Sequence, residues 1–403
     1  MNVRHSALLR TISLAFPALL LSACSLLNGA GQPAEPEPLP PAAPPIPEPV
    51  ATHRYEIDPE REDVIGQIQV VKANHEDTLT DIARRFNVGY EELVRANPGV
   101  DPWLPGEGRE IVVPSQFILP NAPREGLVIN SAAMRLFYFP KRKSGEKQVV
   151  YTHPIGIGKV GWKTPEGTTK VVRKAKDPTW RPGPGVRAEH KKNGEILPAV
   201  VPPGPDNPLG TRAMYLGWPS YLIHGTNKPA GVGLRSSHGC IRLFPEDVEF
   251  IYEMVQVGDK VTVVNQPFVF GWHDEQLYLQ AYDVLEDDPR DWQKAQKKLI
   301  SRSLAQRIQA QLKSRAEAIN WEAVAKLAHE PRGIPVSVSA AEASIEQVLA
   351  AAPRVQNRVP AGATWDGRSG LPADDQQSFQ QLLSDSDPDA PSSSATRGAP
   401  PRT

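Results

Sequence analysis

The sequence predicts a mainly β central domain with one helix, preceded by a small βααβ domain and followed by a helical extension and a disordered tail. Two observations predict this arrangement. Short runs of alternating polar and apolar residues, separated by glycine-bearing turns, fill residues 125–266, which is typical of strands. The 42 prolines of the 403-residue chain cluster toward its ends and in loops. Proline withholds a backbone donor, so such segments do not join a compact core.

The first residues are typical of an export signal. Arg4 and Arg10 supply positive charge, residues 11–21 form a short apolar run, and the letters LSA precede Cys24. The run is shorter than the ~20 apolar residues of a membrane span, so residues 1–23 are predicted to be a signal peptide. The tetrapeptide LSAC resembles a bacterial lipobox, and this resemblance implies that Cys24 is lipidated. Ordinary cleavage beside an incidental cysteine is the alternative.

Residues 24–60 are predicted to form an extended linker. Residues 32–50 read QPAEPEPLPPAAPPIPEPV, and proline at this density favours a solvated polyproline II chain. At ~3.1 Å per residue, the linker could reach on the order of 100 Å. That length suits a protein fixed to a membrane that acts some distance away, although a plain solubilising spacer has the same composition.

A small domain is predicted over residues 67–114. Residues 68–70 form a short strand, and a capping box begins an amphipathic helix at Thr78. A second helix covers residues 90–96, and residues 109–113 form a closing strand. The apolar face of the first helix comprises Leu79, Ile82, Ala83 and Phe86.

This strand, helix, helix, strand order resembles a LysM domain, a module that binds glycans containing N-acetylglucosamine. The letters HEDTLTDIARRFNV and EELVRANPGV carry the likeness. The Gly-Asp pair that usually precedes the first helix is Glu76-Asp77 here, so another small βααβ domain is the alternative.

The central domain, residues 125–266, is predicted to contain one helix. Pro245 suits the first turn, Gly258 follows the end, and residues 260–264 form the next strand. The apolar stripe of this helix comprises Val248, Ile251, Tyr252 and Val255. Earlier strands are predicted at residues 127–130, 134–139 and 148–152.

Residues 268–351 are predicted to be a partly helical extension, with a polar helical stretch from about residue 291 to 327 that packs along one face only. We expect the extension to cap a cleft or to dock a partner. From residue 352 to 403, Pro, Ser, Asp and Gly dominate and large apolar residues become rare, which predicts a disordered tail.

Two short segments carry the chemistry: IHGT, which contains His224, and SSHGCIRL, which contains Cys240. A thiol is a useful nucleophile only as thiolate, and an imidazole can take its proton. His238, two residues before Cys240, would share its face on an extended strand, and a strand–loop–strand connection could bring His224 back to it. Backbone N–H groups near Gly239 and Cys240 are candidate oxyanion donors.

Two other interpretations of this cluster stay open. Cys240 could be a buried core thiol, since free cysteine is among the most buried residue types. His224, His238 and Cys240 could also bind zinc, although neither a C-x-x-C nor an H-E-x-x-H pattern is present. Neither accounts as well for two histidines beside a Ser-His-Gly-Cys turn.

The two segments together resemble the signature of YkuD-type L,D-transpeptidases, most of all the ErfK/YbiS subgroup of Gram-negative envelopes. The likeness covers about 140 residues and includes the upstream letters PIGIG, TPEG and DPTW. It implies a β-sandwich fold, with Cys240 as nucleophile and His224 as the base that accepts and returns its proton. It places Ser237, His238 and Gly239 along the site, and Arg242 on a substrate carboxylate or in a structural salt bridge.

The resemblance also implies a reaction without metal or cofactor. Cys240 would attack the diaminopimelate carbonyl of a peptidoglycan tetrapeptide stem, release D-Ala and form a thioester. The acceptor could be the lysine of an outer-membrane lipoprotein, a second stem peptide, or water. A non-catalytic lipoprotein that only binds the wall through its LysM-like domain is the alternative of a different class.

Charge and the signal segment define the expected surroundings. The formal net charge is −1 with no basic stripe, which gives no footprint for nucleic acid. The expected partners are therefore peptidoglycan glycan and stem peptides, and a membrane through the N-terminal lipid. The residue after Cys24 is Ser25 rather than Asp, which favours the periplasmic face of the outer membrane.

Overall fold

The computed structural model describes residues 45–292, 294, 319–339 and 344–361, except residues 60, 143 and 144. The predicted signal peptide with Cys24, most of the linker, residues 295–318 of the predicted helical stretch and the tail beyond residue 361 lie outside the described residues. Within the described part, no helix has both the length and the apolar composition to cross a membrane.

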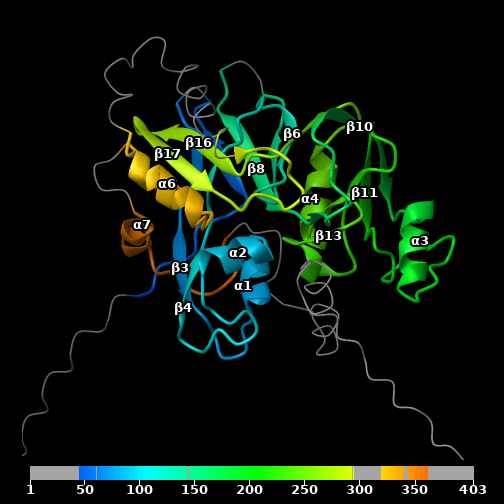
Figure 1. Ribbon diagram of the computed structural model, residues 1–403, viewed down its shortest axis with the longest axis horizontal. Helices are drawn as coiled ribbons and strands as arrows, with labels where there is room; N and C mark the ends of the chain where they lie inside the picture. The colour runs from blue at the N-terminus through cyan, green and yellow to red at the C-terminus, as the bar shows by residue number, and fades with distance from the viewer. Residues whose placement is uncertain are drawn as a thin grey trace, which may run out of the picture. The chain divides into compact units, whose positions relative to one another are not determined.

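A nine-stranded mixed sheet forms the centre of the fold (Figure 1). Its pairs are antiparallel except β6–β15 and β12–β14, which are parallel. The strands, in spatial order, are β1 (Arg54–Ile57), β8 (Gln148–Pro154), β7 (Arg135–Phe139), β6 (Gly126–Asn130), β15 (Lys260–Val264), β10 (Gly167–Lys176), β11 (Arg212–Leu216), β12 (Leu222–His224) and β14 (Ile241–Arg242).

Strand β10 joins the two halves of this sheet. Its first residues pair with β15, and after an irregularity between Val171 and Arg173 it continues alongside β11. Apolar residues from both halves and from α4 (Pro245–Met254) share one buried core. The mainly β class and the helix beginning at Pro245 are therefore confirmed, but the central domain also contains a second helix at Pro184–Lys192. The residues of α4 that enter this core are Val248, Ile251 and Tyr252, followed by Val255.

The predicted βααβ domain is also present, as β3 (Gln69–Lys72), α1 (Leu79–Arg85), α2 (Tyr90–Ala96) and β4 (Glu110–Val113). Strands β3 and β4 pair antiparallel, and the capping box between Thr78 and Asp81 is confirmed. We call residues 67–114 the LysM-like module. Its core is not separate, because Phe86 and Leu93 lie in one cluster with Phe137 of β7.

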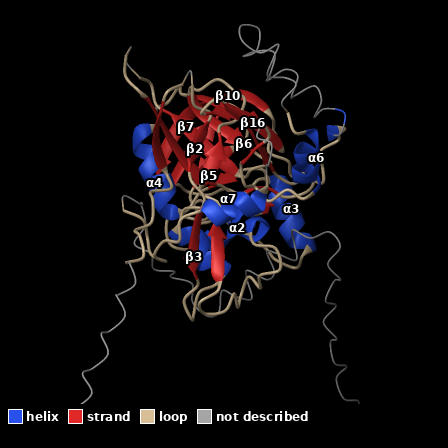
Figure 2. Ribbon diagram, turned by 90° about the vertical axis from the view of Figure 1, so that its left-hand side faces the viewer, coloured by secondary structure: helices blue, strands red, loops and turns tan. Residues whose placement is uncertain are grey.

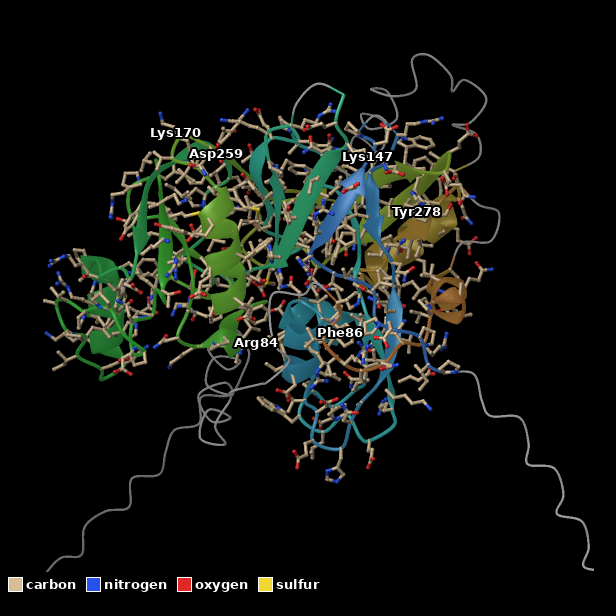
Figure 3. All side chains as sticks on the ribbon, turned by 180° about the vertical axis from the view of Figure 1, so that it is seen from behind. Arg84, Phe86, Lys147, Lys170, Asp259 and Tyr278 are labelled. Carbon is tan, nitrogen blue, oxygen red and sulfur yellow. The ribbon has the colours of Figure 1, made fainter. Side chains whose placement is uncertain are left out.

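Charged contacts also join the module to α4. Arg84 of α1 donates two hydrogen bonds to Glu246, at 3.0 and 2.9 Å, and Figure 3 shows Arg84 at the junction of the two helices. Seen from the side in Figure 2, α2 lies below the strands of the main sheet. The module is thus packed onto the central domain.

The described part of the extension contains a small sheet and two helices, of which only the first overlaps the end of the predicted helical stretch. Strands β16 (Phe268–His273) and β17 (Gln276–Ala281) form a hairpin that β18 (Val336–Ser337) extends. Asp274 and Glu275 in its turn have φ of 45° and 62°, the conformation of tight hairpin turns. Helix α6 (Trp321–His329) packs on this sheet, and α7 (Ile345–Ala351) follows. Composition had indicated only the helical stretch.

Both predicted disordered boundaries need correction. Within the predicted linker, β1 pairs with β8, because Tyr55 and Ile57 alternate with polar residues and fit a sheet edge. Within the predicted tail, Val355 donates to Val70 of β3 at 2.8 Å and is buried. The ordered chain therefore extends on each side beyond the limits that proline content predicts.

Shorter elements complete the region around the candidate residues. Strands β2 (Val64–Gly66) and β5 (Gln116–Ile118) pair beside the module, and β9 (Ile157–Gly158) pairs with β13 (Arg235–Ser237). The 3-10 turn η1 covers Pro229–Gly231. Helix α3 (Pro184–Lys192), which buries none of its residues, lies at the edge of the view in Figure 1 and was not predicted.

Candidate active site

The parallel pair β12–β14 brings the two chemistry-bearing segments side by side. Ile223 lies opposite Ile241 and His224 opposite Arg242. Both isoleucines enter the main core. Because side chains alternate along strands, His224 and Arg242 emerge on the other face, and Cys240 directly precedes β14. The fifteen residues between His224 and Cys240 therefore form a connection that returns to the strand from which it started.

His224 is held in one orientation. Its side chain is only 4 % exposed, and its Nδ1 lies 2.6 Å from the carbonyl oxygen of Gly225. A carbonyl can only accept, so Nδ1 carries the hydrogen and Nε2 keeps its lone pair. Burial, with the nearby charge of Arg242, lowers the pKa of His224 to about 3. The imidazole is therefore neutral at pH 7 and able to accept a proton.

Cys240 is a half-buried free thiol. Its Sγ lies 3.6 Å from the carbonyl oxygen of Ser220, which accepts the weak S–H hydrogen bond. Burial raises the pKa of Cys240 above its ordinary value, while the Leu222 backbone and the charge of Arg242 oppose this rise. In the resting site the pair is therefore thiol and neutral imidazole.

The turn from Ser237 to Cys240 is fixed by its own hydrogen bonds. The Ser237 hydroxyl donates to the Cys240 carbonyl at 2.5 Å and accepts from the Gly239 N–H at 3.1 Å. Thr164 donates to the Gly239 carbonyl at 2.9 Å. Gly239 has φ +99°, and an added Cβ would come within 2.8 Å of the Tyr221 ring. Ser237 and the Gly239 N–H thus shape the turn in this state.

Arg242 has a buried guanidinium beside the cysteine. It donates to the Ser236 hydroxyl at 3.2 Å, and its Nε is buried without an acceptor. Burial lowers the pKa of Arg242 from its usual value. No carboxylate of the described residues pairs with it, so the salt bridge considered from the sequence is not formed there. The charge remains available for an anionic group.

His238 lies toward α3 instead of completing a cluster with His224. Its Nε2 is 3.3 Å from a carboxylate oxygen of Glu189 in α3, and its ring meets that of Trp162 edge-on at 4.8 Å. Glu189 also pairs with Lys159. Burial, partly offset by Glu189, lowers the pKa of His238 to about 4. Among the described residues, no group of three or more His, Cys, Asp or Glu side chains is arranged to hold a metal.

Sequence reasoning missed three contributors to this site. Thr164 belongs to the TPEG letters that carried the likeness, yet nothing in them indicates its bond to Gly239. Trp162 and Glu189 reach His238 from segments 76 and 49 residues away, which no spacing rule connects. The Gly225 carbonyl that orients His224 lies in the quoted IHGT segment, but only the folded strand directs it toward the ring.

The resting state predicts the pH dependence of the Cys240 thiol. In a full-length Cys24→Ser chain, Cys240 is the sole cysteine, because the protein has two. The rate of iodoacetamide alkylation should rise with pH through neutrality, with a midpoint above the ordinary thiol pKa of about 8.5, because burial disfavours the thiolate. Intact-protein mass spectrometry measures that rate. A rate already maximal at pH 6 would instead indicate a preformed thiolate–imidazolium pair.

Comparisons with known proteins cover both ordered domains. The family described as L,D-transpeptidase catalytic domain (YkuD) matches residues 124–263, and the LysM domain family matches residues 73–114. The chain is 48 % identical over 207 residues to "Probable L,D-transpeptidase YbiS" of Escherichia coli K12, an alignment covering 51 % of this chain and 66 % of that protein. This coverage falls just short of two thirds of the relative's length.

Two further relatives align over more of their own length. "Probable L,D-transpeptidase ErfK/SrfK" of Escherichia coli K12 is 39 % identical over 247 residues, which is 60 % of this chain and 78 % of the relative. The protein of the same name from Salmonella typhimurium is 37 % identical over 290 residues, which is 71 % of this chain and 91 % of the relative.

Proposed function

This chain belongs to the L,D-transpeptidase family, and on that premise we propose that Cys240 carries an acyl group from one peptidoglycan stem peptide to an amine. The observation that supports this most directly is the parallel strand pair that sets His224 opposite Arg242, two residues after Cys240. The Gly225 carbonyl fixes the His224 tautomer, so the free Nε2 is the atom that would take the thiol proton.

The first half-reaction forms a thioester. Cys240 Sγ attacks the carbonyl of diaminopimelate at position three of a tetrapeptide stem while its proton passes to His224 Nε2. The tetrahedral intermediate then breaks its C–N bond, and His224 returns the proton to the departing amine of D-Ala. A covalent nucleophile in this way divides one difficult amide exchange into two easier steps.

The second half-reaction consumes the thioester. An acceptor amine attacks the acyl carbon, His224 takes the amine's proton, and Cys240 leaves as the thiol after receiving that proton. Neither half requires a metal or an organic cofactor. The acceptor that we propose is the terminal lysine of an outer-membrane lipoprotein; a second stem peptide or water would be the other outcomes.

One cation of the site suits a negative charge on the substrate. Arg242 has a buried guanidinium with Nε unpaired, so a substrate carboxylate or the oxyanion of the intermediate would complete its hydrogen bonding. A buried donor without a partner is costly, and filling it contributes to binding. His238, held between Trp162 and Glu189, would line the side of the site that faces α3. Ser237 and Gly239 would act through the shape of the turn.

We also place the protein in the periplasm, with the LysM-like module on the glycan strand. Lipidation of Cys24 and anchoring in the outer membrane remain predictions from the lipobox-like letters. Globomycin treatment of cells, which blocks lipoprotein signal cleavage, tests them. Accumulation of an uncleaved precursor is expected for the natural chain, and its absence would show ordinary signal cleavage.

Product analysis tests the reaction and identifies the acceptor. Purified protein is incubated with a disaccharide-tetrapeptide, with and without a peptide ending in lysine, and the products are separated by mass. We expect D-Ala release and a conjugate between tripeptide and lysine. A dimer linked through two diaminopimelates would assign the second stem as acceptor, a free tripeptide would assign water, and no D-Ala release would contradict the proposal.

Replacing His224 with glutamine should lower kcat by about 10²- to 10⁴-fold, the usual contribution of a general base. Glutamine keeps an amide near the ring position and cannot shuttle the proton. Initial rates of D-Ala release measure the effect. His273→Gln serves as the matched control, because His273 lies in β16 of the extension and is partly exposed. Equal rates in the two variants would remove His224 from the mechanism.

A further inference from the structure

The loop between His224 and Cys240 rests on the LysM-like module. Gly233, near its middle, accepts a hydrogen bond from the Glu91 N–H of α2 at 3.3 Å. A Cβ on Gly233 would lie 2.2 Å from the Tyr90 nitrogen and 2.6 Å from the Gly89 Cα. The two backbones are therefore in direct contact at Gly233, with no room for a side chain.

Apolar packing surrounds this backbone contact. Tyr90 of α2 forms one buried cluster with Ala230 and Leu234 of the loop. Gly233 has φ +83°, a conformation that glycine adopts at little cost. A loop exposed to solvent needs neither a glycine with positive φ nor buried apolar contacts. The presence of both indicates that the loop packs specifically against α2.

Few residues separate this contact from the cysteine. Leu234, next to Gly233, accepts from the Ile157 N–H at 3.0 Å, and Arg235–Ser237 continue as β13 beside β9. The Ser237 hydroxyl donates a hydrogen bond to the Cys240 carbonyl at 2.5 Å. The hydroxyl of Ser236, in the same strand, accepts a hydrogen bond from Arg242. A displacement at Gly233 would therefore reach the thiol and the guanidinium through hydrogen-bonded backbone.

The start of α2 is itself fixed by a buried ion pair. The Glu92 carboxylate accepts from the Gly89 N–H at 2.6 Å and from Arg135 of β7 through two bonds of 2.7 Å. Arg135 is 0 % exposed. It also donates to the Asn87 carbonyl at 3.1 Å, and Asn87 donates to Asp247 of α4. The start of α2, which contacts Gly233, is thus hydrogen-bonded to β7 and, through Asn87, linked to α4.

We propose that the LysM-like module is a positioning element of the active site, in which Gly89 and Tyr90 of α2 set the path of the loop that presents Cys240. The proposal rests on the proposed function of Cys240. It gives the module a second role besides glycan binding. Without the first turn of α2, the loop would lose the contacts that fix its backbone conformation. Gly89, Tyr90 and Gly233 act on the reaction through other residues and touch no substrate.

Three full-length variants, each with Cys24→Ser, test the proposal. Gly233→Ala places a methyl group against α2. Gly89→Val approaches from the module's side, where φ is an ordinary −77° and an ideal Cβ lies 3.0 Å from the Gly233 Cα. Gly99→Ala is the control, because Gly99 has φ +76° and no neighbour within 4 Å of an added Cβ. It carries the backbone strain of Gly233→Ala without the contact.

Two readouts separate positioning from folding. The first is kcat and KM for D-Ala release from the disaccharide-tetrapeptide; the second is the pH midpoint of Cys240 alkylation. Gly233→Ala and Gly89→Val should lower kcat about 10- to 100-fold, as expected of a misplaced reacting group, with KM within about threefold and a shifted alkylation midpoint. Gly99→Ala should stay within about twofold of the parent chain on both readouts.

The proposal is overturned if both contact variants match Gly99→Ala in kcat and midpoint. Should Gly233→Ala fail to fold by circular dichroism, Gly89→Ala, which has no φ strain, decides by the same criteria. If the parent chain shows no turnover, the proposed function fails. The alkylation midpoints then still decide, by a shift or its absence, whether α2 positions the thiol.

Discussion

Replacing Cys240 with alanine is expected to abolish D-Ala release, with a loss of at least about 10⁴-fold in kcat. The proposed mechanism has no other nucleophile: His224 is buried and hydrogen-bonded through Nδ1, and Ser237 is bonded within its turn. Removing the thiol leaves only the binding contribution of the site, which does not break an amide on a measurable timescale. Initial rates with the purified disaccharide-tetrapeptide measure the loss.

The fold should be unaffected by this change. Cys240 is half-buried, and its thiol makes one weak bond to the Ser220 carbonyl, so Cys240→Ala should cost no more than about 1 kcal/mol of stability. Cys24→Ser is the matched control, since it removes the other cysteine. A Cys240→Ala chain that folds and still releases D-Ala at the parental rate would end the enzyme interpretation of this site.

Replacing Arg135 with methionine should lower the free energy of unfolding by about 3–5 kcal/mol, the usual cost of removing one partner of a buried ion pair. The guanidinium is fully buried, forms two bonds with Glu92 and lies 3.9 Å from the centre of the Phe117 ring. Without it, the Glu92 carboxylate stays buried without its cationic partner. Chemical denaturation at pH 7 measures the change.

Two comparisons separate burial from charge in this prediction. Arg54→Met breaks an ion pair with Glu56 whose side chains are each 46 % exposed, so it should cost under about 1 kcal/mol. The double variant Arg135→Met with Glu92→Leu should recover part of the loss, because no charge is left without a partner. A loss for Arg135→Met no larger than that for Arg54→Met would show that the pair does not stabilise the junction.

Local signals predicted several of the individual elements. The helix beginning at Pro245 and the Thr78 capping box depend on residues within one or two turns, and both are confirmed. Strand β15 matches its predicted range of residues 260–264. The LysM-like order of elements was likewise visible, because the apolar stripe of each helix can be recognised within a short window of sequence.

Long-range contacts are what local patterns could not supply. Helix α3 buries no residue, so it has no apolar stripe, and Glu189 gives no sign that it will meet His238. The ordered residues around Val355 depend on a strand edge about 285 residues earlier, at Val70. Proline content alone therefore placed the boundaries of the ordered residues wrongly. The contact between Gly233 and α2 could likewise be found only from the folded structure.

The proposed function depends above all on acylation of Cys240, which intact-protein mass spectrometry of the rapidly quenched reaction can detect. With the disaccharide-tetrapeptide as donor and no added amine, the chain should gain the mass of the substrate minus that of D-Ala. Peptide mapping should place the adduct on Cys240, and hydroxylamine should remove it. An adduct on another residue, or steady D-Ala release from a chain that never carries one, would contradict the proposed function.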